Sequence, residues 1–321
     1  MSEPRHPGRR AALAALAATA WPLHAQDRSV RFVAPAAAGG ISDTVGRLLA
    51  EGMAGPLGQP IVVENRAGAG GLIGTQAVVH APADGRTVLV TSLSSQVMAP
   101  LLQKAGFDPE ADLQAVGLAV RMVGLLLVHR DVPARTLKEF IALARQPGRR
   151  LAYASAGQGS ANHIGVEQFK ALTGSELLHV PYKGGAPAVT ALMAGEVQFS
   201  LLDFNTAQLA LKGGQARALA QTGARRHVAL PDIPTLAEAG LPGFDPGFWV
   251  GLAVPRGTPA AAIGPLNAAL QHALDTTAFK ARAQANGWVP AGGPPEVLAR
   301  QVHQDLAAYR PVVQQVGLAG A

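Results

Sequence analysis

The sequence predicts an α/β protein of two lobes, each built on a parallel sheet, with the lobes joined by hinge crossings. A strand–loop–helix pattern recurs in two separate sets, and β-rich segments lie between and after the sets. The chain has 321 residues, of which 48% are hydrophobic, so it can form two cores. We expect residues 26–122 to begin lobe 1 and residues 123–227 to form lobe 2. Residues 228–321 then return through the hinge and complete lobe 1.

Residues 1–25 have the features of a secretory signal peptide. A basic stretch that ends at Arg9 and Arg10 precedes an apolar run, and this run is shorter than the ~20 residues that a membrane helix requires. We expect cleavage after Ala25 and a soluble, exported mature protein. The arginine pair leaves both the general and the twin-arginine export routes open. The chain has no cysteine, which excludes disulfides, thiol catalysis and a lipid anchor on an N-terminal cysteine.

The first set alternates short apolar strands with amphipathic helices. Strands are expected at residues 29–35, 59–65 and 86–92, and helices at 43–57 and 72–81. The second set repeats this order, with strands at 148–155, 175–182 and 195–203 and helices at 161–174 and 186–195. The β-rich segments 113–132 and 247–259 are expected to carry the chain between the lobes.

The loops that follow these strands are rich in glycine, alanine and serine. Two of them read "PAAAGGIS" (residues 35–42) and "ASAGQGS" (residues 154–160). In an open parallel sheet, ligands bind beyond the carboxyl ends of the strands, where loops lead into helix N-termini. Glycine allows a ligand to approach the backbone closely, and a helix N-terminus offers free N–H groups and partial positive charge. The loops therefore suit a carboxylate or another small oxyanion.

The charge and the motifs exclude several other classes of protein. The net charge is +6, but the basic residues are scattered and no basic run is interleaved with aromatic residues, so we expect no nucleic-acid partner. The stretch "GAGGLIG" fails as a dinucleotide loop because Ile73 stands where glycine or alanine is required. No phosphate-binding loop occurs, and no histidine pair has metal-ligand spacing, so we expect neither a cofactor nor a metal.

The histidines have structural interpretations. His129 and His179 lie in apolar strands and are expected to serve packing. His163 follows Ser160 by three residues, which permits a nucleophile–base pair, but packing within the first helical turn is the favoured interpretation.

Several segments together resemble the Bug (TctC-like) family, the extracytoplasmic receptors of tripartite tricarboxylate transporters. They include residues 30–78, "YASAGQGSANHIGVEQFKALTG", "HVPYKGGAPAVTALMAGEVQFSLLD" and "WVGLAVPRGTP", in the family's order. The resemblance implies a bilobal periplasmic binding protein (type II-like) that is not an enzyme. It also implies a monomer in the periplasm, without a lipid anchor, that holds a small carboxylate by backbone amides, hydroxyls and waters. Membrane permease subunits would be its partners.

Matching positions in lobe 1 give the first part of the implied ligand site. The loop residues are Ala38, Gly39 and Gly40. Ser42 is expected to cap the next helix, and Asp43 lies in its first turn, with simple capping as an alternative role. At the end of the third strand, the resemblance adds the hydroxyls of Ser92 and Ser95.

In lobe 2 the resemblance selects the loop after residues 148–155 and two charged side chains. The loop residues are Ser155, Gly157, Gln158, Gly159 and Ser160. Lys183 is a candidate cation for the ligand, or a solvated lysine. Asp203 could hold waters, bind a ligand amine or stabilise the hinge.

The chain departs from the family pattern close to the first loop. Ala36 and Ala37 stand where an aromatic residue and a proline are usual, Ile41 replaces a glycine, and Gln158 stands where asparagine is common. The smaller Ala36 suits a longer or aromatic acid. A receptor that signals to a membrane kinase would use the same pocket, and neighbouring permease genes would distinguish transport from sensing. An exported hydrolase is a remote alternative, because no convincing nucleophile, base and oxyanion set occurs.

Overall fold

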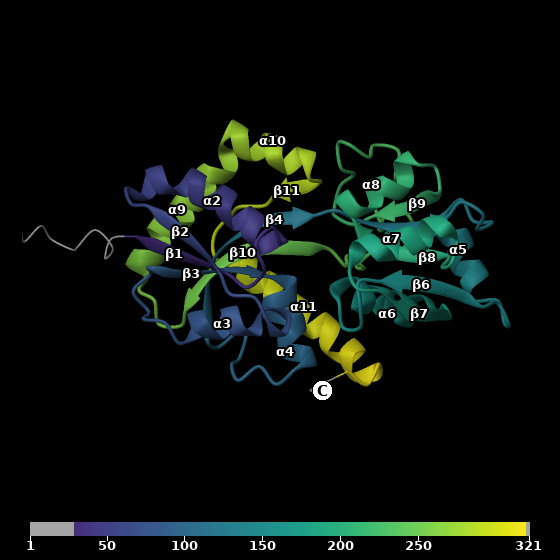
Figure 1. Ribbon diagram of the computed structural model, residues 1–321, viewed down its shortest axis with the longest axis horizontal. Helices are drawn as coiled ribbons and strands as arrows, with labels where there is room; N and C mark the ends of the chain where they lie inside the picture. Colours follow the sequence, from purple (N-terminus) through teal and green to yellow (C-terminus); the bar gives the residue numbers. More distant parts are fainter. Residues whose placement is uncertain (1–28, 319–321) are drawn as a thin grey trace, which may run out of the picture.

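The computed structural model describes residues 29–318 and shows two α/β lobes side by side along the long axis (Figure 1). The predicted signal peptide lies outside the described residues. No helix within residues 29–318 is long and apolar enough to cross a membrane.

Lobe 1 contains a six-stranded sheet with helices on both faces. The strand order is β11-β4-β10-β3-β1-β2. The strands are β1 (Val30–Ala34), β2 (Ile61–Asn65), β3 (Thr87–Ser92), β4 (Leu113–Met122), β10 (Phe248–Pro255) and β11 (Trp288–Pro290). The helices are α2 (Ile41–Leu57), η3 (Ala69–Gly71), α3 (Leu72–Val79), the π-helix η4 (Leu93–Met98), α4 (Ala99–Leu102), α9 (Ala260–Asp275), α10 (Thr277–Ala285) and α11 (Glu296–Gln315).

Lobe 2 contains a five-stranded sheet in the order β7-β6-β8-β5-β9. Its strands are β5 (Gly124–His129), β6 (Leu151–Ser155), β7 (Leu177–Pro181), β8 (Phe199–Asp203) and β9 (Ala216–Gln221). Its helices are α5 (Leu137–Ala144), α6 (Ala161–Thr173), α7 (Gly185–Ala194) and α8 (Phe204–Lys212). The prediction of two α/β lobes is therefore confirmed.

The sheets differ from the prediction in one respect, because both are mixed rather than wholly parallel. Strands β1, β2 and β3 are parallel, as are β6, β7 and β8, but β10 and β5 run antiparallel to their neighbours. The parallel strands of both lobes end at the boundary between the lobes. A strand that begins just after the chain has crossed this boundary, as β5 and β10 do, therefore runs away from it and lies antiparallel to its neighbours.

The hinge lies where β4 passes into β5. Val123 separates these strands, and its N–H donates to the carbonyl of Gly287 in lobe 1 (3.1 Å), while its own carbonyl accepts from the N–H of Phe204 in lobe 2 (2.9 Å). The returning strand β10 begins beside it, since Phe248 pairs with Met122. These contacts fix both lobes to one short segment.

Each lobe has its own hydrophobic core, and a further cluster joins the two. In lobe 2, Phe140 stacks on Phe199 with ring centroids 4.7 Å apart. The joining cluster brings Ile164 of α6 together with Trp249 and with Leu298 of α11. Helix α11, yellow in Figure 1, thus supports α6 of the other lobe. Burial of this cluster places the start of α6 beside the boundary between the lobes.

Candidate functional site

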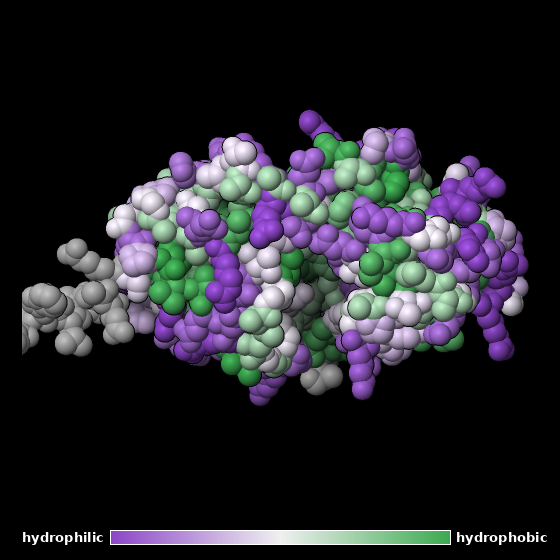
Figure 2. Space-filling view, turned by 45° about the horizontal axis from the view of Figure 1, so that its top comes forward, coloured by the Kyte–Doolittle hydropathy of each residue, from purple (hydrophilic) through white to green (hydrophobic). Residues whose placement is uncertain are grey.

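A cavity of about 460 Å³ opens between the two lobes. Figure 2 shows the molecule hollowed at this place, with hydrophobic residues at the floor. Both lobes contribute to its wall. The lining residues are Ile41, Ser92, Leu93, Ser94, Met122, Ala156, Ser160, Ala161, Asn162, Gly185, Ala186, Leu202, Asp203, Thr206, Phe248 and Trp249.

Helix N-termini from both lobes meet at this cavity. Ile41 begins α2, Ala161 and Asn162 begin α6, Gly185 and Ala186 begin α7, and α8 follows Asp203. The first N–H groups of a helix have no intrahelical partner. Each such terminus favours a nearby anion by about 0.3–1 kcal/mol, and by up to ~2 kcal/mol where it is partly buried. Their convergence can hold an anion without a charged side chain.

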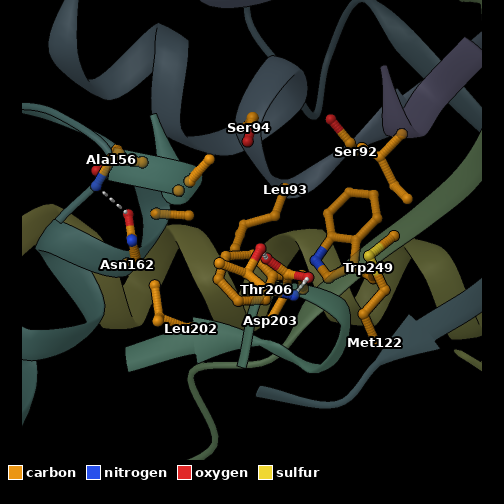
Figure 3. Close-up of a pocket in the computed structure, with 16 residues that line it drawn as sticks. Ser92, Leu93, Ser94, Met122, Ala156, Asn162, Leu202, Asp203, Thr206 and Trp249 are labelled. Atoms are coloured by element: carbon orange, nitrogen blue, oxygen red, sulfur yellow. Dashed lines mark hydrogen bonds between the residues drawn. The ribbon is translucent and has the colours of Figure 1, made fainter. Parts of the chain in front are cut away.

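The side chains that line the cavity include one ionisable group. Asp203 caps α8, where its Oδ1 accepts from the Thr206 N–H (3.1 Å) and its Oδ2 from the Thr206 hydroxyl (2.6 Å), as Figure 3 shows. No lysine, arginine or histidine occurs among the lining residues. Any favourable charge for an anion must therefore come from backbone N–H groups and helix termini.

Part of the cavity lining is apolar and is here called the apolar wall. It comprises Leu93, Met122, Leu202, Phe248 and Trp249. Figure 3 shows the Trp249 indole close to Ser92. The indole N–H donates to Asp305 Oδ2 (2.7 Å), which fixes the ring. A ligand that suits this wall carries hydrocarbon as well as an acidic group.

The loop of residues 35–40, here called the lobe-1 loop, is held by Asp43. Its Oδ2 accepts from the Gly39 N–H (2.8 Å), and its Oδ1 accepts from Asn65 Nδ2 (2.9 Å) and pairs with Arg47 (2.9 Å). Burial raises the pKa of Asp43, but the hydrogen bonds from Arg47, Gly39 and Asn65 outweigh it and hold the pKa below its ordinary value. Asp43 therefore acts on the loop as a buried anion.

The predicted capping role of Ser42 is wrong. Gly40 is the N-cap of α2, and Ser42 is the second helical residue. The Asp43 carboxylate instead reaches back to the loop, which leaves no capping role for the Ser42 hydroxyl. Ser42 and Asp43 are both buried, Ala38 and Gly39 are exposed, and none of them lines the cavity.

The two serines selected at the end of β3 have different positions. Ser92 lines the cavity and caps η4, where its hydroxyl accepts from the Ser95 N–H (3.3 Å). Ser95 is buried, and its hydroxyl accepts from the Ser92 N–H (3.1 Å). Ser94, which the sequence analysis did not select, faces the cavity, as Figure 3 shows. The wider turn of a π-helix alters which hydroxyl points outward, and nothing in the sequence pattern indicated it.

The loop of residues 156–160, here called the lobe-2 loop, has Ser160 on the cavity wall. The Ser160 hydroxyl donates to the Gly157 carbonyl (2.5 Å), and Asn162 Oδ1 accepts from the Ala156 N–H (3.3 Å). Ser155 is fully buried, with its hydroxyl 2.7 Å from His179 Nε2. Ser160 thus meets the cavity directly, while Ser155 supports the loop from behind.

The remaining selected residues of lobe 2 lie around the cavity. Gln158 and Gly159 line a smaller neighbouring cavity of about 290 Å³, which shares Ser94, Ser160 and Ala161 with the first. Gly157 lines neither cavity, and Lys183 is exposed and lines neither. Asp203 is part of the main wall.

The geometry gives no support to serine chemistry at this loop. His163 Nδ1 accepts the Gly159 N–H (3.0 Å), so that nitrogen is already occupied and does not face Ser160. The Ser155–His179 pair has the short distance of a nucleophile and base, but Ser155 is inaccessible to a substrate. Within residues 29–318, no group of three or more acidic or histidine side chains could hold a metal ion.

Several lining residues were missed by the sequence analysis. Asn162, Gly185 and Thr206 follow the strand-end loops that it identified, so the first helical residues after each loop were the available signal. Met122 and Phe248 lie in the segments 113–132 and 247–259, which were expected to carry the chain between the lobes, but nothing in these segments distinguished the side that faces the cavity.

Two α/β lobes that enclose a cavity bordered by helix N-termini beside a common hinge define a bilobal solute-binding protein. The chain belongs to the tripartite tricarboxylate transporter family of receptors (TctC), whose family model matches residues 45–318. The resemblance to Bug receptors is thereby confirmed.

Individual proteins extend this comparison. Protein BugT of Bordetella pertussis is 31% identical over 90% of both chains. The structure of R. palustris Rpa4515 with adipate is 33% identical, covers 94% of this chain and 100% of its own, and has a TM-score of 0.74. MatC from Rhodopseudomonas palustris with bound malate is 36% identical, covers 89% and 99% of the two chains, and has a TM-score of 0.71.

Proposed function

We propose that this protein is a periplasmic receptor that captures a small carboxylate and delivers it to the membrane permease subunits of a tripartite tricarboxylate transporter, without catalysing a reaction. The observation that carries the proposal is the cavity between the lobes, where several helix N-termini converge and no cationic side chain lines the wall. This arrangement suits binding and release of an anion, because uncharged donors leave no fixed countercharge behind.

The wall suggests the chemistry of the ligand. Polar groups from both lobes line the cavity, Ser92 and Ser94 from lobe 1 and Ser160 and Asn162 from lobe 2, together with apolar side chains. A carboxylate with a hydrocarbon body complements this mixed lining. Relatives solved with adipate and malate bind acids of this kind. Di- and tricarboxylates, acidic amino acids and aromatic acids are the compounds to test.

The direct test is a thermal-shift screen of the mature chain. Adipate, malate, citrate, glutamate and benzoate serve as probes, and each positive compound is then measured by calorimetry. A ligand at about one hundred times its Kd stabilises the folded state by ~2.7 kcal/mol, which gives a clear rise in melting temperature. A folded protein that responds to no carboxylate, and instead to an uncharged solute, would contradict the proposal.

A second test concerns location. We expect cell fractionation to recover the chain from the periplasm without residues 1–25. Recovery of an intact N-terminus from the cytoplasm would contradict delivery to a permease.

A further inference from the structure

The lobe-1 and lobe-2 loops share one backbone plan. The penultimate residue of each is a left-handed glycine, Gly39 with φ +80° and Gly159 with φ +75°. The next residue is the N-cap of the helix, and its N–H closes a turn: Gly40 donates to the carbonyl of Ala37 (3.0 Å), and Ser160 to that of Gly157 (3.2 Å). The two helices therefore begin in the same way beside the same cavity.

The third helical residue closes both loops. In lobe 1 the Gly39 N–H donates to Asp43 Oδ2 (2.8 Å), and in lobe 2 the Gly159 N–H donates to His163 Nδ1 (3.0 Å). Both acceptors are buried, and neither lines the cavity. The position of the acceptor is the same, but lobe 1 uses a carboxylate and lobe 2 an imidazole.

His163 is held in place by a second imidazole. Its ring stacks on His179 with centroids 3.9 Å apart, and His179 stacks on Tyr153 at 4.9 Å. His179 Nε2 lies 2.7 Å from the Ser155 hydroxyl, which also accepts the Gly157 N–H (3.2 Å). The stacked pair thus contacts Gly159 within the lobe-2 loop and Ser155, the residue just before it.

We propose that His163, supported by His179, is the positioning residue that shapes the lobe-2 loop for its anion, and that only the neutral form of His163 performs this role. The inference rests on the proposed function, because it concerns the same cavity. It assigns to His163 the part that Asp43 plays in lobe 1.

The hydrogen bond from Gly159 requires a lone pair on His163 Nδ1. A proton on that nitrogen would place two donors face to face and release the loop. The charged and titratable groups around the ring are His179 from β7, Tyr153 from β6, and Glu167 and Lys170 from α6 itself. Glu167 already accepts from Tyr153 (2.6 Å) and pairs with Lys170 (2.9 Å).

These surroundings favour the neutral ring. Burial, together with His179 nearby, lowers the pKa of His163 to about 4. The loop should therefore keep its shape throughout the neutral range and lose it on acidification. The lobe-1 loop has no such imidazole, so acid should affect the two loops differently.

The test measures adipate and malate binding by calorimetry from pH 3.5 to pH 8 in three variants. His163→Phe keeps the aromatic stack but removes the acceptor, and we expect binding at least tenfold weaker at pH 7.5. His163→Asn restores an oxygen acceptor that cannot titrate. We expect it to bind within about threefold of the wild type at pH 7.5, and to lose less affinity below pH 5. Protonation of adipate or malate at low pH affects binding to the wild type and to His163→Asn equally, so it cancels in the comparison of the two.

His129→Phe is the matched control, because His129 Nδ1 also accepts one backbone N–H, that of Asp131 (3.3 Å), at the end of β5. We expect its binding to match the wild type at every pH. Equal affinity of His163→Phe and the control would overturn the proposal, as would an unchanged acid response in His163→Asn.

A ligand-free measurement separates this inference from the proposed function. Amide hydrogen exchange by NMR should show faster exchange at Gly159 in His163→Phe, by at least tenfold, while Gly39 exchanges as in the wild type. This result would support the positioning role even if neither probe binds. Unchanged protection of Gly159 would overturn that role regardless of the ligand.

Discussion

The lobe-1 and lobe-2 loops share the same backbone turn at a helix start beside the cavity, but they are stabilised by different chemistry. Asp43 is a buried anion whose other oxygen meets Asn65 and the half-exposed Arg47. His163 is a buried neutral ring within an aromatic stack. In both loops the N–H of the left-handed glycine needs an acceptor on the third residue of the following helix. A charged carboxylate supplies it in lobe 1 and a neutral imidazole in lobe 2. The difference implies that salt and acid act on the two loops separately.

The largest expected effect comes from removing the acceptor of lobe 1. Asp43→Ala leaves the Gly39 N–H, the Asn65 amide and Arg47 without their shared partner. Loss of a buried charged acceptor costs about 2–3 kcal/mol, so we expect carboxylate affinity to fall thirty- to a hundredfold and the melting temperature to fall. Calorimetry and thermal unfolding measure both quantities.

Arg47→Ala is the control for this variant. The Arg47 side chain is 55% exposed and its pair with Asp43 spans one helical turn, so its loss should cost only about 0.5 kcal/mol. Equal losses in the two variants would show that charge, rather than the loop hydrogen bond, matters in lobe 1.

A second prediction separates the loops by pH. The unfolded chain protonates His163 near pH 6.5, whereas the folded protein does so near pH 4, so between these values the unfolded state binds more protons. The free energy of unfolding should therefore rise with pH from about 4 to about 6.5 and level off above, by about 3 kcal/mol for this residue. Urea unfolding of wild type and His163→Asn at several pH values isolates the contribution of His163 to the free energy of unfolding.

Asp43 affects stability in a lower pH range than His163, and its contribution also rises with pH. Its folded-state pKa is lowered, so its contribution is complete above its ordinary value and is lost as the pH falls through the lower, folded-state value. Burial also lowers the pKa of His179 and of His227, which adds to the rise in stability and makes the comparison with His163→Asn necessary. Parallel curves for wild type and variant would contradict the prediction.

A third prediction concerns the hydroxyls of lobe 2. Replacing Ser155 and Ser160 together by alanine removes the bonds to His179 and to the Gly157 carbonyl. We expect binding at least tenfold weaker, about 1.4 kcal/mol, with little loss of folding. The single variants show which hydroxyl matters, and Ser94→Ala tests the opposite wall. Unchanged affinity of the double variant would remove the lobe-2 loop from the site.

The smallest expected effect compares the two left-handed glycines. A Cβ at Gly39 meets nothing within 4 Å, whereas a Cβ at Gly159 lies 2.9 Å from Leu102 of the other lobe. Alanine costs about 1 kcal/mol in this backbone conformation, so Gly39→Ala should lose that amount. Gly159→Ala should lose about 1 kcal/mol more, as measured by thermal unfolding. Equal losses would mean that Leu102 yields without cost.

The sequence predicted the alternation of strands and helices well, because apolar periodicity determines it locally. The expected strand at 86–92, for example, is β3 (Thr87–Ser92). The antiparallel β5 and β10 were not predicted, since strand direction depends on how the chain crosses between lobes. The loops were identified, but Ser94 and the apolar wall required the π-helix and the pairing of Met122 with Phe248, a contact between segments far apart in the chain.

Trp249 should allow ligand binding in the cavity to be followed by tryptophan fluorescence. Its indole borders the cavity, and its N–H is fixed to Asp305. Of the three tryptophans in the sequence, Trp21 lies outside the described residues and Trp288 is buried in lobe 1. A bound ligand changes the polarity around one indole and leaves the other as an internal standard. The unlabelled protein should therefore report occupancy through its own emission, fast enough to follow capture and release in a stopped-flow experiment.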